Sequence, residues 1–415
     1  MAFKSAFAAL RQDGVLALRN LWRSPARSGL ALLTIVGGIV AYVLAAGFID
    51  WVLLSMRDYQ IYAQLGHFQI SHSGYVEKGG ADPYRFLIPR NDVSLAKLVQ
   101  RPDIITVTPR LALSGLISLG ERTVGFLGEG IDPSREVFIN RHMDIRSGRN
   151  LQHAEEKSVL LGEGLAASLN AKAGDHVVLL AKTISGSQNA VECVVAGIFS
   201  SSVKAYDDAF LRLPIDIAQQ LVRTNGATTF VGILHRTDDT DKVVAALRPG
   251  LNSMGMSIFA WHEQADFYRK TVALFSKQVG VIRFIIALII VLSVTNTLSM
   301  SVAERTSEIG TSLALGSRRM DILRMFLTEG VVLGIVGGVL GLCIGALLAE
   351  LISNVGIPMP PPPGMAHGYV GQIRFSWPVA LDAFLLAGVT TLVASVLPAW
   401  RASRMNIVDA LRQGR

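Results

Sequence analysis

The chain has 415 residues, of which 50% are hydrophobic and 17% are charged, and its formal net charge is +7. This composition is too apolar for an ordinary soluble protein and too charged for a chain that lies wholly in a membrane. We therefore expect one part in a membrane and one globular part. Cys193 and Cys343 fall in an outer region and in an apolar segment, respectively, so we expect no disulfide framework.

Four apolar segments have the length of roughly 20 residues that a helix needs to cross a bilayer. They are residues 29–54, 279–302, 331–353 and 377–400. The first is too long for a removable signal peptide and lacks a small-residue cleavage site after a short core, so we interpret it as a retained anchor. The sequence predicts an α-helical membrane protein with four transmembrane helices.

Basic residues cluster in segments 1–28, 303–330 and 401–415, whereas the loop 354–376 contains only Arg374. Positive charge next to a span resists translocation, which places these three segments and both termini in the cytoplasm. The basic balance then reflects topology and anionic headgroups, and it does not imply nucleic acid. Segment 1–28 is predicted to be an amphipathic helix along the inner leaflet or a continuation of the first span.

Residues 55–278 lie between the first two spans and predict one large extracytoplasmic α+β domain, with a single core or two small lobes. Alternating short strands are expected in GHFQISHSGY, ITVTPRLALSGLISLG, ERTVGFLGEGIDP, DHVVLLAK, AVECVVAGIF and TTFVGILHRT. Helices are expected over residues 157–170, 213–223 and 238–255. Residues 262–278 predict a helix that runs directly into the second span and is able to carry force between domain and membrane.

The sequence contains no GxxxxGK[ST], HExxH, paired CxxC or GxSxG motif. We therefore expect a protein that is not an enzyme and holds no cofactor or metal, so any ATP is used by a partner. His67 and His72 are five residues apart and would point to opposite faces of a strand. That spacing fits ordinary polar surface positions better than a metal site.

Polar residues within the predicted spans are costly and merit a functional hypothesis. Asp50, Arg283, Glu350 and Asp382 lie near the outer ends of the spans, where interfacial anchoring is the favoured interpretation. Asn296 lies too deep to reach the interface, and we expect it to form a hydrogen bond with another helix.

The third span carries glycines at three- and four-residue steps, a pattern that lets helix backbones approach closely in lipid. They are Gly330, Gly334, Gly337, Gly338, Gly341 and Gly345. The loop 354–376 after this span contains Pro358 and residues 360–363, also prolines, which predict a stiff polyproline II spacer or a recognition epitope.

Segment 303–330 predicts a cytoplasmic elbow. Residues 303–315 would form a short helix with Ile309 on one side and Glu304 and Glu308 on the other. Gly316 would close this helix in the left-handed conformation, and Ser317 would cap the next one. A generic positive-inside loop does not explain Glu304 and Glu308, because only positive charge is useful for topology there.

Three stretches carry a family resemblance. Residues 303–341, AERTSEIGTSLALGSRRMDILRMFLTEGVVLGIVGGVLG, and 397–412, LPAWRASRMNIVDALR, resemble the signatures of MacB/FtsX-type ABC transporter permeases. LRNLWRSPARSGLALLTIVG resembles that family's entry to the first span. The order of one span, a large outer domain and three further spans is also the family's, so the resemblance covers the whole chain. It implies a bacterial inner-membrane protein with a MacB-like periplasmic core domain.

By this resemblance the elbow contains the coupling helix that docks on a separate ATP-binding subunit. The contact residues it implies are Glu304, Arg305, Glu308, Ile309, Gly310, Ala314, Leu315 and Gly316. Two ATP-binding subunits, which hold ATP and Mg²⁺, would work with two copies of this permease or with this chain and a homologous one. Their closure would move the coupling helices, and the long first and second helices would pass the motion to the outer domains, which is called mechanotransmission.

GHFQISHSGY, residues 128–133 (GEGIDP) and 259–267 (FAWHEQADF) resemble lipoprotein-releasing (LolC/LolE-type) permeases. This branch implies extraction of a lipoprotein or lipid and its transfer to a periplasmic carrier. Glu308-Ile309-Gly310 instead has the macrolide-exporter form, which keeps open the efflux of a drug, peptide or siderophore with an adaptor. A signalling scaffold that activates a periplasmic hydrolase, as in the FtsX branch, is the third alternative, although the outer region is larger than that branch needs.

Overall fold

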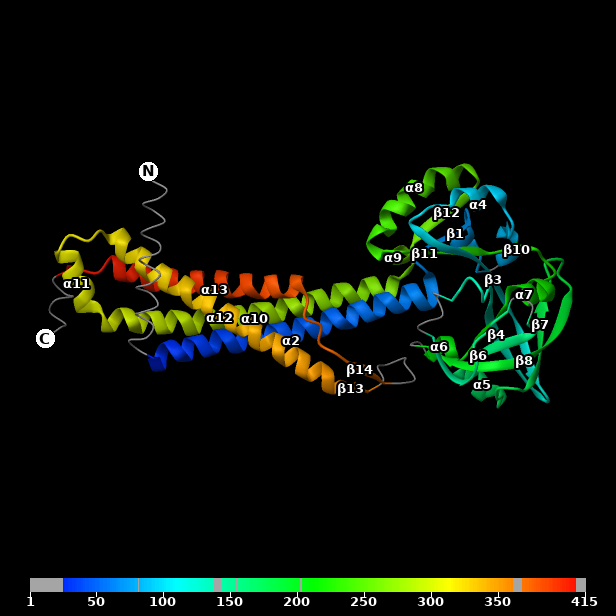
Figure 1. Cartoon of the computed structure of the whole chain (residues 1–415), viewed down its shortest axis with the longest axis horizontal. Coiled ribbons are helices and arrows are strands. Elements are labelled where there is room, and N and C mark those ends of the chain that lie inside the picture. The colour runs from blue at the N-terminus through cyan, green and yellow to red at the C-terminus, as the bar shows by residue number, and fades with distance from the viewer. Residues whose placement is uncertain are drawn as a thin grey trace. The chain divides into compact units, whose positions relative to one another are not determined.

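The computed structural model describes residues 25–80, 82–137, 143–153, 156–201, 204–360 and 368–407, with side chains from residue 28 onward (Figure 1). The chain divides into two compact units. The long helices form one, and Leu54–Lys270 makes up most of the other, which we call the sheet domain. The predicted amphipathic helix in segment 1–28 and the last part of the tail 401–415 lie outside the described residues.

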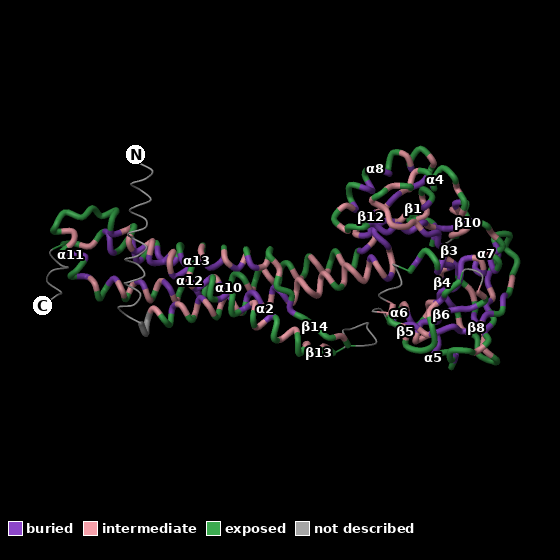
Figure 2. The backbone as a smooth tube through the Cα atoms, in the orientation of Figure 1, coloured by how far each residue is buried: buried purple, intermediate pink, exposed green. Residues whose placement is uncertain are grey.

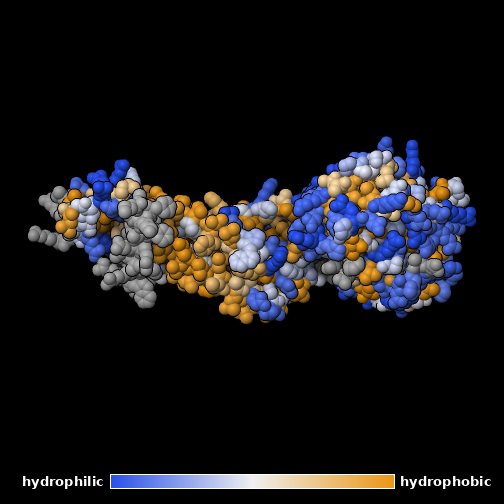
Figure 3. Space-filling model, turned by 45° about the horizontal axis from the view of Figure 1, so that its top comes forward, coloured by the Kyte–Doolittle hydropathy of each residue, from blue (hydrophilic) through white to orange (hydrophobic). Residues whose placement is uncertain are grey.

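Four long helices run alongside one another and form the helical bundle (Figure 1). They are α2 (Pro25–Tyr59), α10 (Asp266–Glu304), α12 (Arg319–Val355) and α13 (Trp377–Ser403). Each contains one predicted span and is long and apolar enough to cross a membrane. Apolar residues also dominate the outer surface of this unit (Figure 3). The prediction of a membrane protein with four transmembrane helices is confirmed.

Buried positions recur along the bundle helices and alternate with exposed ones (Figure 2). The bundle core combines residues of all four helices, including Ile39, Ile290, Leu333 and Ala387. A short helix, α11 (Thr306–Ala314), connects α10 to α12 and packs against the same bundle.

The sheet domain is built on a mixed sheet of ten strands among the described residues. The strands are β1 (Phe68–His72), β3 (Ile104–Leu119), β4 (Arg122–Ile131), β5 (Asp144–Gly148), β6 (Ser158–Gly162), β7 (His176–Lys182), β8 (Gln188–Ser200), β9 (Phe210–Pro214), β11 (Thr229–Leu234) and β12 (Met256–Ala260). Their order is β12, β1, β11, β3, β4, β9, β6, β8, β5, and β7 pairs with both β3 and β8. Two further strands, β2 (Ile88–Pro89) and β10 (Gly226–Ala227), pair with each other.

Helices cover the sheet and complete two hydrophobic cores. They are α3 (Tyr75–Lys78), η2 (Pro83–Phe86), α4 (Val93–Leu98), α5 (Glu163–Leu169), α6 (Lys204–Asp207), α7 (Ile215–Val222), η4 (Thr237–Asp239), α8 (Thr240–Ser253) and α9 (Trp261–Gln264). One core lies under α5 and α7, and the other under α4 and α8. The 16-residue strand β3 joins them, because its first half pairs with β11 and its second half with β4 and β7.

Three local predictions differ from the structure. Residues 158–162 form the buried strand β6, and only α5 is helical, because a fully buried strand beside a parallel neighbour shows no alternation. Ala265 leaves the helical conformation, so α9 is separate and α10 begins at Asp266. In the loop 354–376, β13 (Ile357–Met359) pairs with β14 (Tyr369–Gly371), which makes Pro358 a strand residue. Residues 361–367, with most of the proline run, lie outside the described part.

Candidate functional site

The structure narrows the elbow to residues 305–318, between the end of α10 and the start of α12. Gly316 adopts φ +98°, the left-handed conformation that the sequence predicts for the end of α11. The residue before α12 is Arg318 rather than Ser317, and the carboxylate of Asp321 accepts a hydrogen bond from its backbone N–H at 3.0 Å. The conformation of Gly316 therefore ends α11, and the hydrogen bond to Asp321 begins α12.

The elbow helix α11 has a buried face and an exposed face. Ile309 is 2% exposed and packs with Val302, Phe326 and Ala399 of the three neighbouring helices, and Gly310 is buried beside it. These two residues, predicted to contact a partner, instead attach α11 to its own bundle.

The exposed face carries most of the other predicted contact residues. Glu304, Glu308, Ala314 and Gly316 are exposed, and Leu315 is 85% exposed at the tip of the turn. The exposed surface thus presents one large apolar side chain, Leu315, near the exposed Arg318 and Arg319 at its tip. At its start it presents two acidic side chains, Glu304 and Glu308.

Arg305, also predicted to face a partner, points inward. Its Nη1 lies 3.7 Å from Oε2 of Glu329 on α12, and both side chains are largely buried. A buried carboxylate needs a cationic partner, since an unpaired buried charge is strongly destabilising. This ion pair therefore braces the start of the elbow against α12.

The glycines of α12 form two seams. A Cβ added to Gly334 would lie 2.1 Å from Oγ1 of Thr391 on α13, and Gly330 and Gly338 face the same helix. A further three glycines, Gly337, Gly341 and Gly345, face α2. At Gly341 the added Cβ would lie 2.7 Å from Cβ of Ile39. Helix α12 thus contacts α13 and α2 at distances that larger residues do not permit.

Two of the polar residues within the spans meet. Arg283 of α10 donates from Nη1 to Oδ1 of Asp382 on α13 at 2.9 Å. The hydroxyl of Tyr42 on α2 donates to the other carboxylate oxygen. The anchoring interpretation assigns each of these residues a separate contact with the membrane interface. In the structure they instead link three helices, α2, α10 and α13. The role of Tyr42 was missed because its partner, Asp382, lies on another helix 340 residues further along the chain.

The other polar span residues behave differently. Asp50 of α2 pairs with Arg374 at 3.6 Å, and Glu350 is exposed. Asn296 is exposed on the outside of the bundle, so the expected hydrogen bond to another helix is not formed within the described part of this chain.

His67 is fully buried in the sheet domain, which makes its predicted surface position wrong, whereas His72 is exposed. Nδ1 of His67 accepts a hydrogen bond from the backbone N–H of Leu234 at 3.2 Å, and Nε2 of His67 lies 3.1 Å from Oγ1 of Thr237. Burial, assisted by the charge of Arg57, lowers the pKa of His67 to about 4, so it is neutral at physiological pH. Across the described residues, no three His, Cys, Asp or Glu side chains are arranged to hold a metal.

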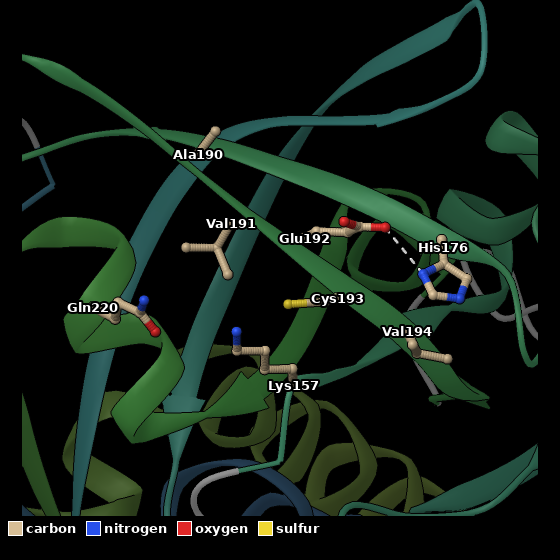
Figure 4. A pocket seen from close by; sticks show the side chains of 8 residues that line it. All are labelled: Lys157, His176, Ala190, Val191, Glu192, Cys193, Val194 and Gln220. Atoms are coloured by element: carbon tan, nitrogen blue, oxygen red, sulfur yellow. Dashed lines mark hydrogen bonds and ion pairs between the residues drawn. The ribbon is translucent and has the colours of Figure 1, made fainter.

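A pocket of about 390 Å³ lies on the sheet domain beside β7 and β8 (Figure 4). Nδ1 of His176 and Oε1 of Glu192 approach to 3.0 Å there, and both side chains are about two-thirds exposed. Cys193 also lines the pocket, but burial raises the pKa of its thiol to about 11 and keeps it protonated at neutral pH. The thiol is therefore not activated as a nucleophile.

Comparison with known families identifies the chain. A family model described as the MacB-like periplasmic core domain matches residues 28–249, and the FtsX-like permease C-terminal model matches residues 280–407. The chain belongs to the MacB/FtsX family of ABC transporter permeases. It is accordingly a membrane protein of the inner membrane, and its sheet domain is the MacB-like periplasmic domain that the resemblance implies.

Relatives of this permease carry several functions in their names. It is 28% identical over 293 residues to an uncharacterized ABC transporter permease of Methanocaldococcus jannaschii, covering 67% of this chain and 68% of that one. It is 24% identical to the pyoverdine export ATP-binding/permease protein PvdT of Pseudomonas entomophila, over 95% of this chain and 58% of that one. It is also 24% identical to the lipoprotein-releasing system transmembrane protein LolC of Xylella fastidiosa, over 94% and 96%. The permease thus spans little more than half of the ATP-binding/permease relative.

Two solved structures are also similar to parts of the permease. The periplasmic region of MacB from Actinobacillus actinomycetemcomitans covers 52% of this chain, with 15% identity, a TM-score of 0.37 and 95% of its own length aligned. The extracellular domain of the transporter YknZ covers 46% of this chain and 98% of its own length, with 12% identity and a TM-score of 0.34.

Proposed function

We propose that this permease works with an ATP-binding subunit that docks on the exposed face of the elbow. The observation that carries the proposal is the two-sided construction of α11. Ile309 and the Arg305–Glu329 pair fix one side to the bundle, while Leu315 and Glu308 are presented on the other. A largely exposed apolar side chain beside charged groups fits a protein interface, whose buried centre is apolar and whose rim is polar.

ATP hydrolysis by two such subunits, which hold ATP and Mg²⁺, would displace the elbows of two permeases, either two copies of this chain or this chain and a homologue. The displacement reaches α12 through Arg305 and Glu329, and it reaches α13 and α2 through the glycine seams. Helices α2 and α10 are each continuous from the bundle into residues of the periplasmic domain. The motion would therefore reach that domain by mechanotransmission, with both termini in the cytoplasm and no substrate channel through the bundle.

The substrate class we propose is an amphiphile, a lipoprotein or lipid, taken from the outer leaflet of the inner membrane and passed to a periplasmic carrier. The near end-to-end match with LolC supports this class. Efflux of a drug, peptide or siderophore through an adaptor is the second candidate, favoured by the name of the PvdT relative and by the Glu308-Ile309-Gly310 triplet.

The proposal is tested by affinity purification of the tagged permease from its native membranes in mild detergent, with mass spectrometry of proteins and lipids. Recovery of an ATP-binding subunit with a lipidated passenger or a specific lipid supports extraction. An ATP-binding subunit with an adaptor replaces extraction by efflux. A periplasmic hydrolase without passenger or adaptor replaces transport by signalling, and the absence of any ATP-binding protein overturns the docking proposal.

A further inference from the structure

The periplasmic end of α2 is held by two buried arginines. Helix α2 continues as the π-helical turn η1 (Gln60–Leu65), which ends at Gly66. The last carbonyl groups of a helix have no partner within it and form the negative end of its dipole. Arg110 donates from Nη1 to the carbonyl oxygen of Gln64 at 2.6 Å, and Arg212 donates from Nη2 to that of Ala63 at 2.8 Å.

Both arginines project from the central strands of the sheet. Arg110 lies on β3 and Arg212 on β9, and β4 pairs with both strands. Glu129 of β4 stands in register with Arg212 and places Oε2 3.3 Å from Nη1 of Arg110 and 4.0 Å from Nη2 of Arg212. The helix end is thus bonded to strands in the middle of the sheet.

A second carboxylate balances the charge of the group. Arg110 donates from Nε to Oε1 of Glu136 at 2.7 Å and from Nη2 to Oε2 at 3.2 Å, a bidentate arrangement. Burial alone would lower the pKa of Arg110, but the charges of Glu136 and Glu129 raise it above its ordinary value, so the guanidinium remains charged. The two arginines and two glutamates sum to zero charge.

Stability alone does not account for this group. Arg110 and Arg212 are 2% and 1% exposed, and taking ions out of water costs so much that apolar residues of similar volume are often as good or better. Apolar residues, however, cannot bond the carbonyls of a helix end, whereas the rigid fork of an arginine can do so in one orientation.

Helix α9 and the first turn of α10 contact the same part of the domain. The backbone N–H of Trp261 donates to the carbonyl oxygen of His67 at 3.0 Å. Trp261, Ala265 and Tyr268 also pack against Ile61 and its neighbours in η1. The two long helices that leave the domain are therefore joined where η1 packs against residues 261–268, a contact that we call the root. The two arginines attach this root to the sheet.

We propose that Arg110 and Arg212 are positioning residues that clamp the end of α2 to the periplasmic sheet, so that a displacement of the helix moves the domain rather than bending the joint. This role rests on the proposed function, because it concerns the transmission that the elbow would start. The clamp itself is a property of the periplasmic domain and can be measured without ATP.

The test compares three variants of the full-length permease, in complex with its ATP-binding subunit in lipid nanodiscs. Arg212→Met removes one carbonyl bond, and the double variant Arg110→Met with Glu136→Met removes the other without leaving Glu136 unpaired. Arg90→Met is the matched control, because Arg90 pairs with Asp132 and Asp216 in the same domain and no bond from it to a helix-end carbonyl is found among the described residues.

Two quantities are measured by hydrogen exchange. The first is the exchange rate of the amides of residues 60–66 without nucleotide, which we expect to rise at least tenfold in both clamp variants and to stay unchanged in Arg90→Met. The second is the change in exchange of β1 and β11 on adding ATP with vanadate. We expect the clamp variants to lose most of that change while their basal ATP hydrolysis persists.

Unchanged exchange at residues 60–66 in both clamp variants overturns the clamp. If the exchange of residues 60–66 rises in the clamp variants but the vanadate-induced change in β1 and β11 is unaltered, the clamp has no role in transmission. A wild-type complex with no response at all contradicts the proposed function, and the first measurement then decides the clamp independently. Should Arg212→Met fail to fold, Arg212→Lys keeps the charge near Glu129 without the guanidinium fork and is expected to loosen the root in the same direction.

Discussion

In the helical bundle the residues at the closest contacts are small and mostly uncharged, whereas the periplasmic domain buries charged side chains at its centre. Gly334 meets Thr391 and Gly341 meets Ile39 in the bundle, while Arg110 and Arg212 lie in the middle of the periplasmic sheet. Lipid gives helices no hydrophobic reason to associate, so close packing has to hold them together. A domain in water gains free energy from its apolar strands, which offsets the cost of burying ions.

In the proposed mechanism this difference would serve two mechanical tasks. The bundle would transmit motion between helices through closely fitting surfaces. The periplasmic domain would receive the motion through directional bonds at the end of α2.

The largest loss is expected from filling a glycine seam. Gly341→Leu would overlap Ile39 and should destabilise the bundle by about 3 kcal/mol, the upper part of the range for overpacked cores. Gly338→Leu should cost less, since a Cβ there meets the Phe384 ring at 3.2 Å. Gly388→Leu, on α13 with no atom near the added Cβ, is the control. Thermal unfolding and the yield of monodisperse protein measure the order, and equal behaviour of Gly341→Leu and Gly388→Leu would refute the seam.

A loss of similar size is expected on acidification of the periplasmic domain. The folded-state pKa of His67 is about 4, below its ordinary 6.5, so the unfolded chain binds the extra proton first. The stability from neutral His67 is therefore complete above pH 6.5 and is lost as the pH falls through 4, by about 3 kcal/mol.

Urea unfolding of the permease in nanodiscs, followed by tryptophan fluorescence between pH 7 and 4, measures this loss. His67→Asn supplies a carbonyl oxygen that can accept from Leu234 N–H without titrating, and it should reduce the pH dependence. An identical pH dependence in both proteins would exclude His67 as the cause.

The ion pair between Arg283 and Asp382 in the bundle should contribute less to the free energy of unfolding. Polar contacts between helices in a membrane contribute about 1 kcal/mol each, so we expect Asp382→Asn to cost about that much. A double-mutant cycle with Arg283→Gln isolates the pair, and Glu350→Gln at an exposed position serves as the control. A coupling energy of zero would mean that the two residues act separately, as the anchoring interpretation holds.

The smallest effect on stability is expected from Glu308→Lys, at an exposed position of the elbow. Unfolding should change by no more than about 0.5 kcal/mol, as for most surface substitutions. The charge reversal should nevertheless uncouple ATP hydrolysis in the complex from the vanadate-induced response of the periplasmic domain. Coupling equal to that of the wild type would remove Glu308 from the docking surface.

The sequence located the four long helices and the spacing of their glycines because both are local properties. Span length follows from the thickness of the hydrocarbon, and a stripe of small residues follows from helix periodicity. Which partner each glycine faces is a tertiary property. Four-residue steps sort the glycines into one series that begins at Gly330 and one that begins at Gly337, but nothing within α12 says that the first meets α13 and the second meets α2.

Long-range contacts explain the other differences. The sequence predicts that Arg305 contacts a partner subunit. Its inward direction is not visible in the sequence because Glu329, with which it pairs, lies on the following helix. Arg110 and Arg212 were missed as a pair because they are brought together by β4, yet each is a single arginine in an otherwise apolar strand, RLALSG and FLRLP. A lone charge in such a strand is the signal that could have found them, since it needs a buried partner.

The central claim, that the exposed face of the elbow docks an ATP-binding subunit, is tested most directly by measuring the affinity of that subunit for the permease in nanodiscs. Leu315→Asp places a charge at the tip of the elbow, where the side chain is 85% exposed. The control, Val355→Asp, places a charge at the C-terminal end of α12, where the side chain is 88% exposed. We predict that Leu315→Asp weakens binding at least tenfold, about 1.4 kcal/mol, while Val355→Asp binds as the wild type does. Equal affinities for wild type and Leu315→Asp would contradict the account.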